Sequence, residues 1–179
     1  CATRILQVAG RSDIPVAIGQ ATPMSGALPE LLQKAYQGPR GHEGSIALPA
    51  LEDSHCGQHA SELIIDLVRQ YPGEITLVCI GAQSNLALAL IKAPDIAPLI
   101  KDVVMMAGAL GMDAKWGRGN ITPVAECNIW FDPQAADIVF RSGIPLSMVS
   151  LDVTNADAGL VLTREHLAGI GDDKPLNQL

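Results

Sequence analysis

Residues 119–128 place three polar side chains, Asn120, Glu126 and Asn128, in an otherwise largely apolar stretch. A polar side chain that points inward must form hydrogen bonds, because an unpaired buried polar group costs about 1–3 kcal/mol. Amides and a carboxylate together offer the donors and acceptors that suit the hydroxyl groups of a sugar. These residues are therefore candidates for a sugar-binding site. The purely structural alternative is that Asn120 caps a turn and that Glu126 is solvated.

The elements that must position this stretch alternate between strands and helices. Apolar, β-branched runs bounded by glycine or polar residues predict strands, and apolar residues at helical spacing predict helices. The predicted strands are residues 14–18, 74–80, 102–106 and 144–151. The predicted helices are residues 2–10, 54–70, 85–92, 133–141 and 164–170. Asp132 and Thr163 are the predicted N-caps of the last two helices.

This alternation is typical of βαβ units and predicts an α/β fold, an open, mostly parallel sheet flanked by helices. The length favours a single domain over residues 1–179. Because the chain opens within a predicted helix, the domain is expected to be incomplete. Ligands of such sheets bind at the carboxyl ends of the strands, so the loops after Ile80, Met106 and Leu151 are the candidate positions.

Composition and charge argue against several classes of partner. Hydrophobic residues make up 48% of the chain, which is enough for a core, and the formal net charge of −7 disfavours nucleic acid as a partner. The four cysteines match neither a zinc-site spacing nor a CxxC redox motif, and they are predicted to be reduced thiols in a cytoplasmic protein. No apolar run is long enough to span a bilayer, and no secretory signal opens the chain.

Four segments carry a resemblance to a known family. The longest is GNITPVAECNIWFDPQAADIVFRSGIPLSMVSLDVT, over residues 119–154. The others are ITLVCIGAQSNLALAL, VVMMAGA and ILQVAGRSDIPVAIG. Together, and in one order along the chain, they resemble the inosine–uridine preferring nucleoside hydrolases. The resemblance implies a Rossmann-like nucleoside hydrolase fold, here incomplete.

The resemblance also implies a set of sugar-binding residues. Asn120, Glu126 and Asn128 fall where the family holds the ribose hydroxyls, and Glu126 and Asn128 are expected to serve catalysis. Met106 falls where a methionine lines the sugar pocket. His42, in the sequence GHEG, is similar to the family's HGxxG loop and is expected to contact substrate.

A calcium ion is the cofactor that the resemblance implies, with the backbone carbonyl of Ile80 as one ligand. The change from the family's usual threonine to isoleucine leaves a carbonyl ligand unaffected. Two family motifs are missing: the aspartate-rich DTDxxxDD near the start and a His-Asp pair in the last third. The late pair Asp172-Asp173 follows no strand and is not a substitute. His166 precedes Leu167, not aspartate, and is expected to be an exposed helical residue.

The expected activity is hydrolysis of the N-glycosidic bond of ribonucleosides to ribose and free base. Breaking this bond builds positive charge on the sugar, as in glycosidases, and a carboxylate such as Glu126 stabilises that charge. The resemblance implies that a complete protein is a homo-oligomer and that its partner is a small ribonucleoside. By itself the 179-residue chain is expected to be inactive.

The sequence leaves several alternatives open. The chain is either part of an ordinary hydrolase or a shortened protein that no longer catalyses, and the presence of Asn120, Glu126 and Asn128 favours the first. A nucleotide-binding module of doubly wound type lacks support, because neither GxGxxG nor GxxxxGK[ST] occurs. A non-catalytic α/β module that binds nucleosides or a protein partner is the remaining alternative.

Overall fold

The computed structural model describes residues 2–26, 55–111, 119–155, 161 and 163–168. The chain forms two compact units. One comprises Cys1–Ile18, Pro29–Gln58 and Val161–Leu179, and the other comprises Gly19–Leu28 and His59–Leu160. The second unit contains the sheet. That residues 1–179 make up a single domain stays a prediction.

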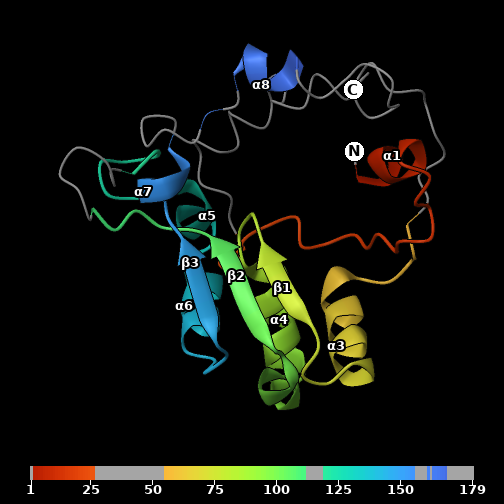
Figure 1. Cartoon of the computed structure of the whole chain (residues 1–179). Helices are drawn as coiled ribbons and strands as arrows, with labels where there is room; N and C mark the ends of the chain where they lie inside the picture. Colours follow the sequence, from red (N-terminus) through yellow and green to blue (C-terminus); the bar gives the residue numbers. More distant parts are fainter. Residues whose placement is uncertain (1, 27–54, 112–118, 156–160, 162, 169–179) are drawn as a thin grey trace. The chain divides into compact units, whose positions relative to one another are not determined.

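The sheet has three parallel strands in the order β1-β2-β3 (Figure 1). They are β1 (Thr76–Cys79), β2 (Asp102–Met106) and β3 (Leu146–Val149). The predicted α/β class and parallel sheet are confirmed. Because the strands run in parallel, their carboxyl ends meet at one edge of the sheet, which is the edge where a ligand site is expected.

Helices cover one face of this sheet in the described part of the chain (Figure 1). They are α3 (Ala60–Gln70), α4 (Ser84–Lys92), the 3-10 helix η2 (Pro94–Leu99), α5 (Cys127–Phe131) and α6 (Pro133–Phe140). The short helix α7 (Leu151–Thr154) follows the carboxyl end of β3. Val103 and Met105 of β2 are fully buried in the core that α4 and α6 complete. On the opposite face of β1, the side chain of Val78 is 68% exposed.

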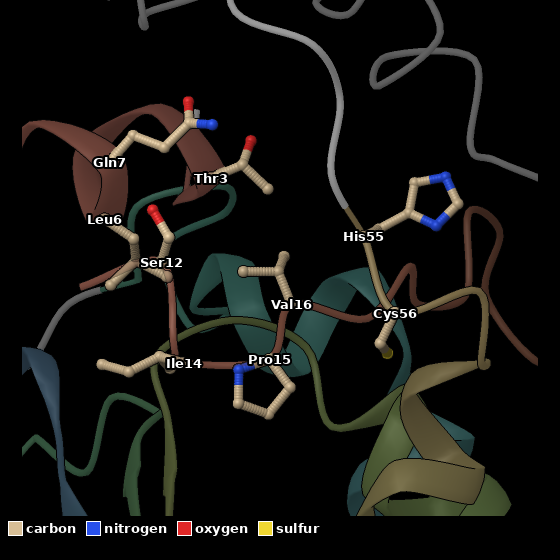
Figure 2. A pocket seen from close by; sticks show the side chains of 9 residues that line it. All are labelled: Thr3, Leu6, Gln7, Ser12, Ile14, Pro15, Val16, His55 and Cys56. Atoms are coloured by element: carbon tan, nitrogen blue, oxygen red, sulfur yellow. The ribbon is translucent and has the colours of Figure 1, made fainter. Parts of the chain in front are cut away.

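The first unit holds α1 (Ala2–Val8) and α8 (Arg164–Ala168). Thr163 caps α8 as predicted, since its hydroxyl accepts from the His166 amide at 3.4 Å, and His166 is exposed. A cavity of about 210 Å³ lies in this unit, with Thr3 and Gln7 of α1 on one side and His55 and Cys56 on the other (Figure 2). None of the predicted site residues lines it.

The predicted strand over residues 14–18 is wrong. The described part of this unit contains no strand, and Ile18 is 58% exposed. A β-branched run becomes a strand only where a neighbouring strand pairs along its length. Here the segment accepts a backbone bond at Val16, from the Cys56 amide at 2.9 Å.

Two predicted boundaries also need correction. The end of the last predicted strand is wrong, because Leu151 opens α7: the carbonyl of Ser150 already accepts from the amides of Val153 and Thr154. The helix predicted from residue 54 begins at Ala60, because the side chain of His59 caps it.

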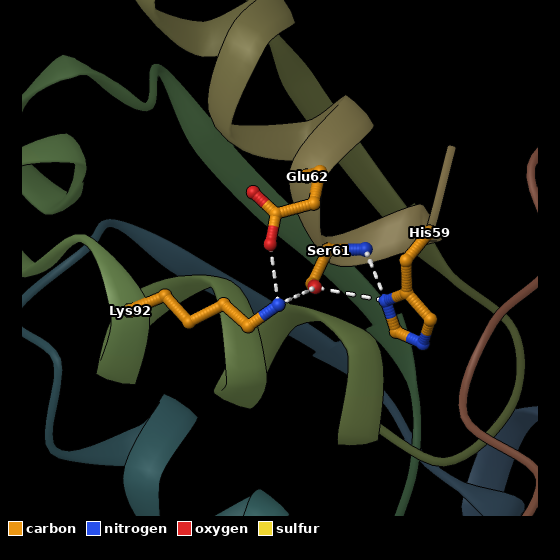
Figure 3. Close-up of polar contacts among 4 residues, drawn as sticks. All are labelled: His59, Ser61, Glu62 and Lys92. Carbon is orange, nitrogen blue, oxygen red and sulfur yellow. Dashed lines mark hydrogen bonds and ion pairs between the residues drawn. The ribbon is translucent and has the colours of Figure 1, made fainter. Parts of the chain in front are cut away.

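His59 caps α3 with its imidazole (Figure 3). Its Nδ1 accepts from the Ser61 amide at 3.2 Å and lies 2.8 Å from the Ser61 hydroxyl. Lys92 at the end of α4 reaches the same hydroxyl at 3.3 Å and pairs with Glu62. This cluster fixes where α3 begins and joins α3 to α4.

Replacing His59 with alanine is expected to lower the free energy of unfolding by about 1 kcal/mol, the usual cost of a lost N-cap. His59→Asn is the control, because asparagine is a good N-cap and keeps the acceptor. Denaturant unfolding of both variants measures the difference. An equal loss in both would show that ring packing, not capping, is what His59 contributes.

Candidate functional site

The candidate site lies at the carboxyl ends of β1 and β2. Ile80 directly follows β1, Met106 ends β2, and Asn128 reaches both from α5. The side-chain nitrogen Nδ2 of Asn128 donates to the Met106 carbonyl at 2.9 Å. It lies 3.5 Å from the Ile80 carbonyl and 3.2 Å from the Met106 sulfur. The structure thus brings together three predicted residues that lie far apart in the sequence.

Glu126 is the most buried residue of this group, at 2% exposure. Its Oε1 accepts from the backbone amide of Asn128 at 2.8 Å. Its Oε2 accepts from the backbone amides of Gly108 and Ile129 at 2.9 and 3.1 Å. It therefore caps α5 and anchors the loop after β2. The alternative that Glu126 is solvated is wrong, because three backbone donors replace water around a buried charge.

Asn120 supports the same helix start. Its Oδ1 accepts from the Cys127 amide at 2.8 Å, although the residue itself is exposed. Asn120 thus caps a turn, as the structural alternative proposed, while lying in the same loop as Glu126. Gly119 is required there, since a Cβ would collide with the backbone of Thr122 and Ala125.

The hydrogen bonds that the site already makes determine what it can still bind. The two amide hydrogens of Asn128 point to backbone carbonyls and sulfur, so Oδ1 is the atom it offers to a ligand. Oε2 of Glu126 takes two donors and Oε1 takes one, which leaves one acceptor position on Oε1. The remaining groups accept, so they suit a ligand that donates, such as a hydroxyl.

A larger cavity of about 470 Å³ adjoins Glu126. Its walls are mainly apolar and include Leu110, Trp130, Phe140 and Met148. Glu126 is the only ionisable residue among the described residues that line it. The third predicted loop reaches the same region, because the Leu151 amide donates to the Gly108 carbonyl at 2.9 Å.

Burial, and secondly the charge of Glu126, raise the pKa of the Cys127 thiol. The thiol is therefore expected to stay protonated at about pH 8.5, near the ordinary thiol pKa. Iodoacetamide at that pH should modify Cys127 more slowly than the exposed Cys56, and Glu126→Gln should accelerate it. Peptide mass spectrometry measures both rates. Equally fast modification of the two cysteines in the unaltered chain would contradict this environment.

Two predicted features have no counterpart among the described residues. His42 lies outside them. Within the described part of the chain, no group of three or more His, Cys, Asp or Glu side chains lies so that it could hold a metal ion. The Ile80 carbonyl is the candidate ligand that is present, on a residue that is 80% exposed.

Comparison with known proteins decides the family. Residues 1–178 match the family model for inosine-uridine preferring nucleoside hydrolases. The chain belongs to this nucleoside hydrolase family. It is 34% identical to uridine nucleosidase 1 of Arabidopsis thaliana over 170 residues, which are 95% of this chain and 48% of that protein. It is 43% identical to the pyrimidine-specific ribonucleoside hydrolase RihA of Shewanella sp. (strain ANA-3), over 86% of this chain and 46% of that protein.

Solved structures of nucleoside hydrolases have the same fold. A plant nucleoside hydrolase, PpNRh1, is 32% identical with a TM-score of 0.82, over 98% of this chain and 54% of that one. The purine-preferring ribonucleoside hydrolase from Gardnerella vaginalis is 30% identical with a TM-score of 0.81, over 99% of this chain and 55% of that one. This nucleoside hydrolase chain thus spans about half the length of the relatives it matches. None of its helices, within the described residues, is long and apolar enough to cross a membrane.

Some residues that shape the site were not predicted. Gly108 supplies a backbone donor to Glu126, and nothing in its sequence context signals this. Asp132 was predicted as a helix cap, but its second oxygen also accepts from Ser84 and from the Met24 amide. Gln83 is buried, and its Oε1 has no hydrogen-bond partner, while its Nε2 donates to the Gly81 carbonyl at 2.9 Å.

Proposed function

We propose that the complete protein hydrolyses the N-glycosidic bond of ribonucleosides, giving ribose and free base. The observation that carries this proposal is the convergence of Asn128 and Glu126 on the carboxyl ends of β1 and β2. Family membership supports the reaction class. The proposal concerns the complete protein, because the chain covers about half of its relatives' length.

In the reaction, a water oxygen bonds to C1′ of the ribose while the electrons of the C–N bond leave with the base. The attacking water loses one proton, and the departing base gains one, so that ribose and the neutral base are released. Positive charge develops on the sugar as the bond breaks. The Glu126 carboxylate, held by three backbone donors, is fixed before the charge appears and needs no reorganisation. Oδ1 of Asn128 and the remaining acceptor position of Glu126 Oε1 each accept from a ribose hydroxyl, which orients the ring.

Nucleoside hydrolases are generally metal-dependent, and we propose calcium as the ion. Ca²⁺ takes about six to eight oxygen ligands. The described residues offer the Ile80 carbonyl and no carboxylate cluster, so they do not make up a calcium site. When it is bound, the ion would orient water and ribose hydroxyls.

The 179-residue chain by itself is expected to bind calcium weakly and to show no hydrolase activity. One neutral carbonyl cannot offset the dehydration of a divalent cation. Isothermal titration with calcium and an inosine hydrolysis assay on the purified chain measure both properties. Micromolar affinity with clear turnover would mean that carboxylates elsewhere, such as Asp172-Asp173, complete the site.

Three further properties stay predictions: a homo-oligomeric complete protein, a cytoplasmic location, and small ribonucleosides rather than nucleic acid as partners. The matched proteins are named for pyrimidine nucleosides in two cases and for purine nucleosides in one. Assays therefore need both uridine and inosine.

Thermal unfolding of the complete protein with calcium tests the proposed site. Uridine or inosine at saturating concentration should raise the Tm, since a ligand that binds only the folded state stabilises it. Stabilisation without turnover would favour the non-catalytic binding module. If neither nucleoside raises the Tm and neither is hydrolysed, both the hydrolase proposal and the binding-module alternative are contradicted.

A further inference from the structure

We propose that Asp132 and Asn85 clamp residues 19–24 onto the start of α4, and that this clamp makes both of them positioning residues for the proposed hydrolysis. The inference rests on the proposed function for its kinetic consequence, but not for the clamp itself.

Asp132 is only 1% exposed, yet no ion pair to it occurs among the described residues. Its Oδ1 caps α6 through the Ala135 amide at 3.1 Å. Its Oδ2 accepts from the Ser84 hydroxyl at 2.6 Å and from the Met24 amide at 3.0 Å. Capping needs one oxygen, and serine, threonine or asparagine would supply it. The second oxygen is therefore used to hold Ser84 and Met24.

The location of Asp132 explains how a buried charge is tolerated. The carboxylate lies between the first residues of α4 and α6, two helices that pack on each other. Helix N-termini carry partial positive charge and stabilise an anion. The carboxylate thus reaches across to segments that are 48 and 108 residues away in the chain.

Asn85 provides a second, independent tether. Its Oδ1 accepts from the Gln20 amide at 2.8 Å. A Cβ on Gly19 would lie 2.5 Å from the side-chain amide nitrogen of Asn85, so the backbone at Gly19 packs directly against that side chain. The two tethers hold the backbone at positions 20 and 24, and together they fix residues 19–24 across the start of α4.

The clamp acts on the candidate site through short connections. Ser84 and Asn85 open α4, which begins four residues after Ile80. Asp132 follows α5, four residues after Asn128. The Asp132 carboxylate is therefore connected through short segments to both groups of the 3.5 Å contact, the Ile80 carbonyl and the side-chain amide of Asn128. Loosening the clamp should shift these partners relative to each other.

The test compares Asp132→Asn, Gly19→Ala and the control Asp137→Asn in the complete protein. Asp132→Asn keeps a capping oxygen but places a side-chain amide group against the Met24 amide. Gly19→Ala adds a Cβ that collides with the Asn85 side chain, so it disrupts this tether without changing Asp132. Asp137 lies on the same helix α6, but it is exposed and pairs with Arg141.

In Asp132→Asn, kcat/KM should fall roughly 10-fold to 100-fold, as small misplacements of reacting groups do, and mainly through kcat. Hydrogen exchange should accelerate locally, at residues 19–26 and 81–85, in both clamp variants and not in the control. A lower Tm with unchanged kcat/KM of the folded protein, or exchange that accelerates uniformly, would overturn the proposal and leave Asp132 as a helix cap.

The two proposals fail separately. If the unaltered protein releases no ribose from uridine or inosine, the proposed function fails. The exchange experiment then still decides the clamp: local acceleration in Asp132→Asn and Gly19→Ala supports it, and unchanged exchange at residues 19–26 overturns it.

Discussion

Glu126→Gln in the complete protein is expected to lower kcat/KM for ribonucleoside hydrolysis by roughly 100-fold or more, as loss of a positioned charged group typically does. Both oxygens of Glu126 accept from backbone amides. A glutamine amide group would set a donor against at least one of these donors. The substitution thus removes the charge and disturbs the start of α5 together.

A matched control separates charge loss at the site from charge loss elsewhere. Glu62→Gln removes a carboxylate from a half-exposed surface pair with Lys92, and it should leave kcat/KM unchanged. Unfolding curves of both variants establish that the assay compares folded proteins. Near wild-type turnover in Glu126→Gln would contradict the role assigned to this loop.

A 2′-deoxyribonucleoside is expected to react at least about 100-fold more slowly than its ribonucleoside, because a site built to bond a hydroxyl leaves its own polar groups unpaired without it. The free groups of Asn128 and Glu126 are acceptors. A 2′-fluoro analogue accepts but does not donate, so it should not restore the rate. Rates of inosine and deoxyinosine hydrolysis make the comparison.

Two outcomes would contradict this interpretation of the sugar contacts. Equal rates on inosine and deoxyinosine would show that residues 119–128 do not bind the 2′-hydroxyl group of the ribose. Full activity on the 2′-fluoro analogue would show that the side-chain amide of Asn128 donates to the ligand instead of to the carbonyls of Met106 and Ile80.

Much of the sheet could be predicted, because its signals are local. Residues 102–106 open on the polar Asp102, continue with two valines and two methionines, and end just before Ala107-Gly108; they match β2 at both ends. Asp132 followed by Pro133 marks a helix start, and α6 begins there. Parallel pairing follows from alternation of strands and helices, so the gathering of Ile80 and Met106 at one edge could also be expected.

Features that depend on distant partners could not be predicted. The apolar run at residues 14–18 has strand composition, but pairing is decided by neighbours that composition does not reveal. The bond between Asp132 and Met24 spans 108 residues. The three backbone donors to Glu126 depend on the path of the loop after β2. The residue types therefore predict that Glu126 is a site residue, whereas its hydrogen-bond partners are known only from the structure.

The proposed hydrolysis is measured by the release of ribose from uridine and from inosine by the complete protein, with calcium supplied. Asn128→Ala, which removes the side chain that joins the ends of β1 and β2, is assayed beside it. We expect ribose and free base in equal amounts from the unaltered protein, and a kcat/KM at least about 100-fold lower in Asn128→Ala. No ribose from either nucleoside, or the same turnover in Asn128→Ala, would contradict the account.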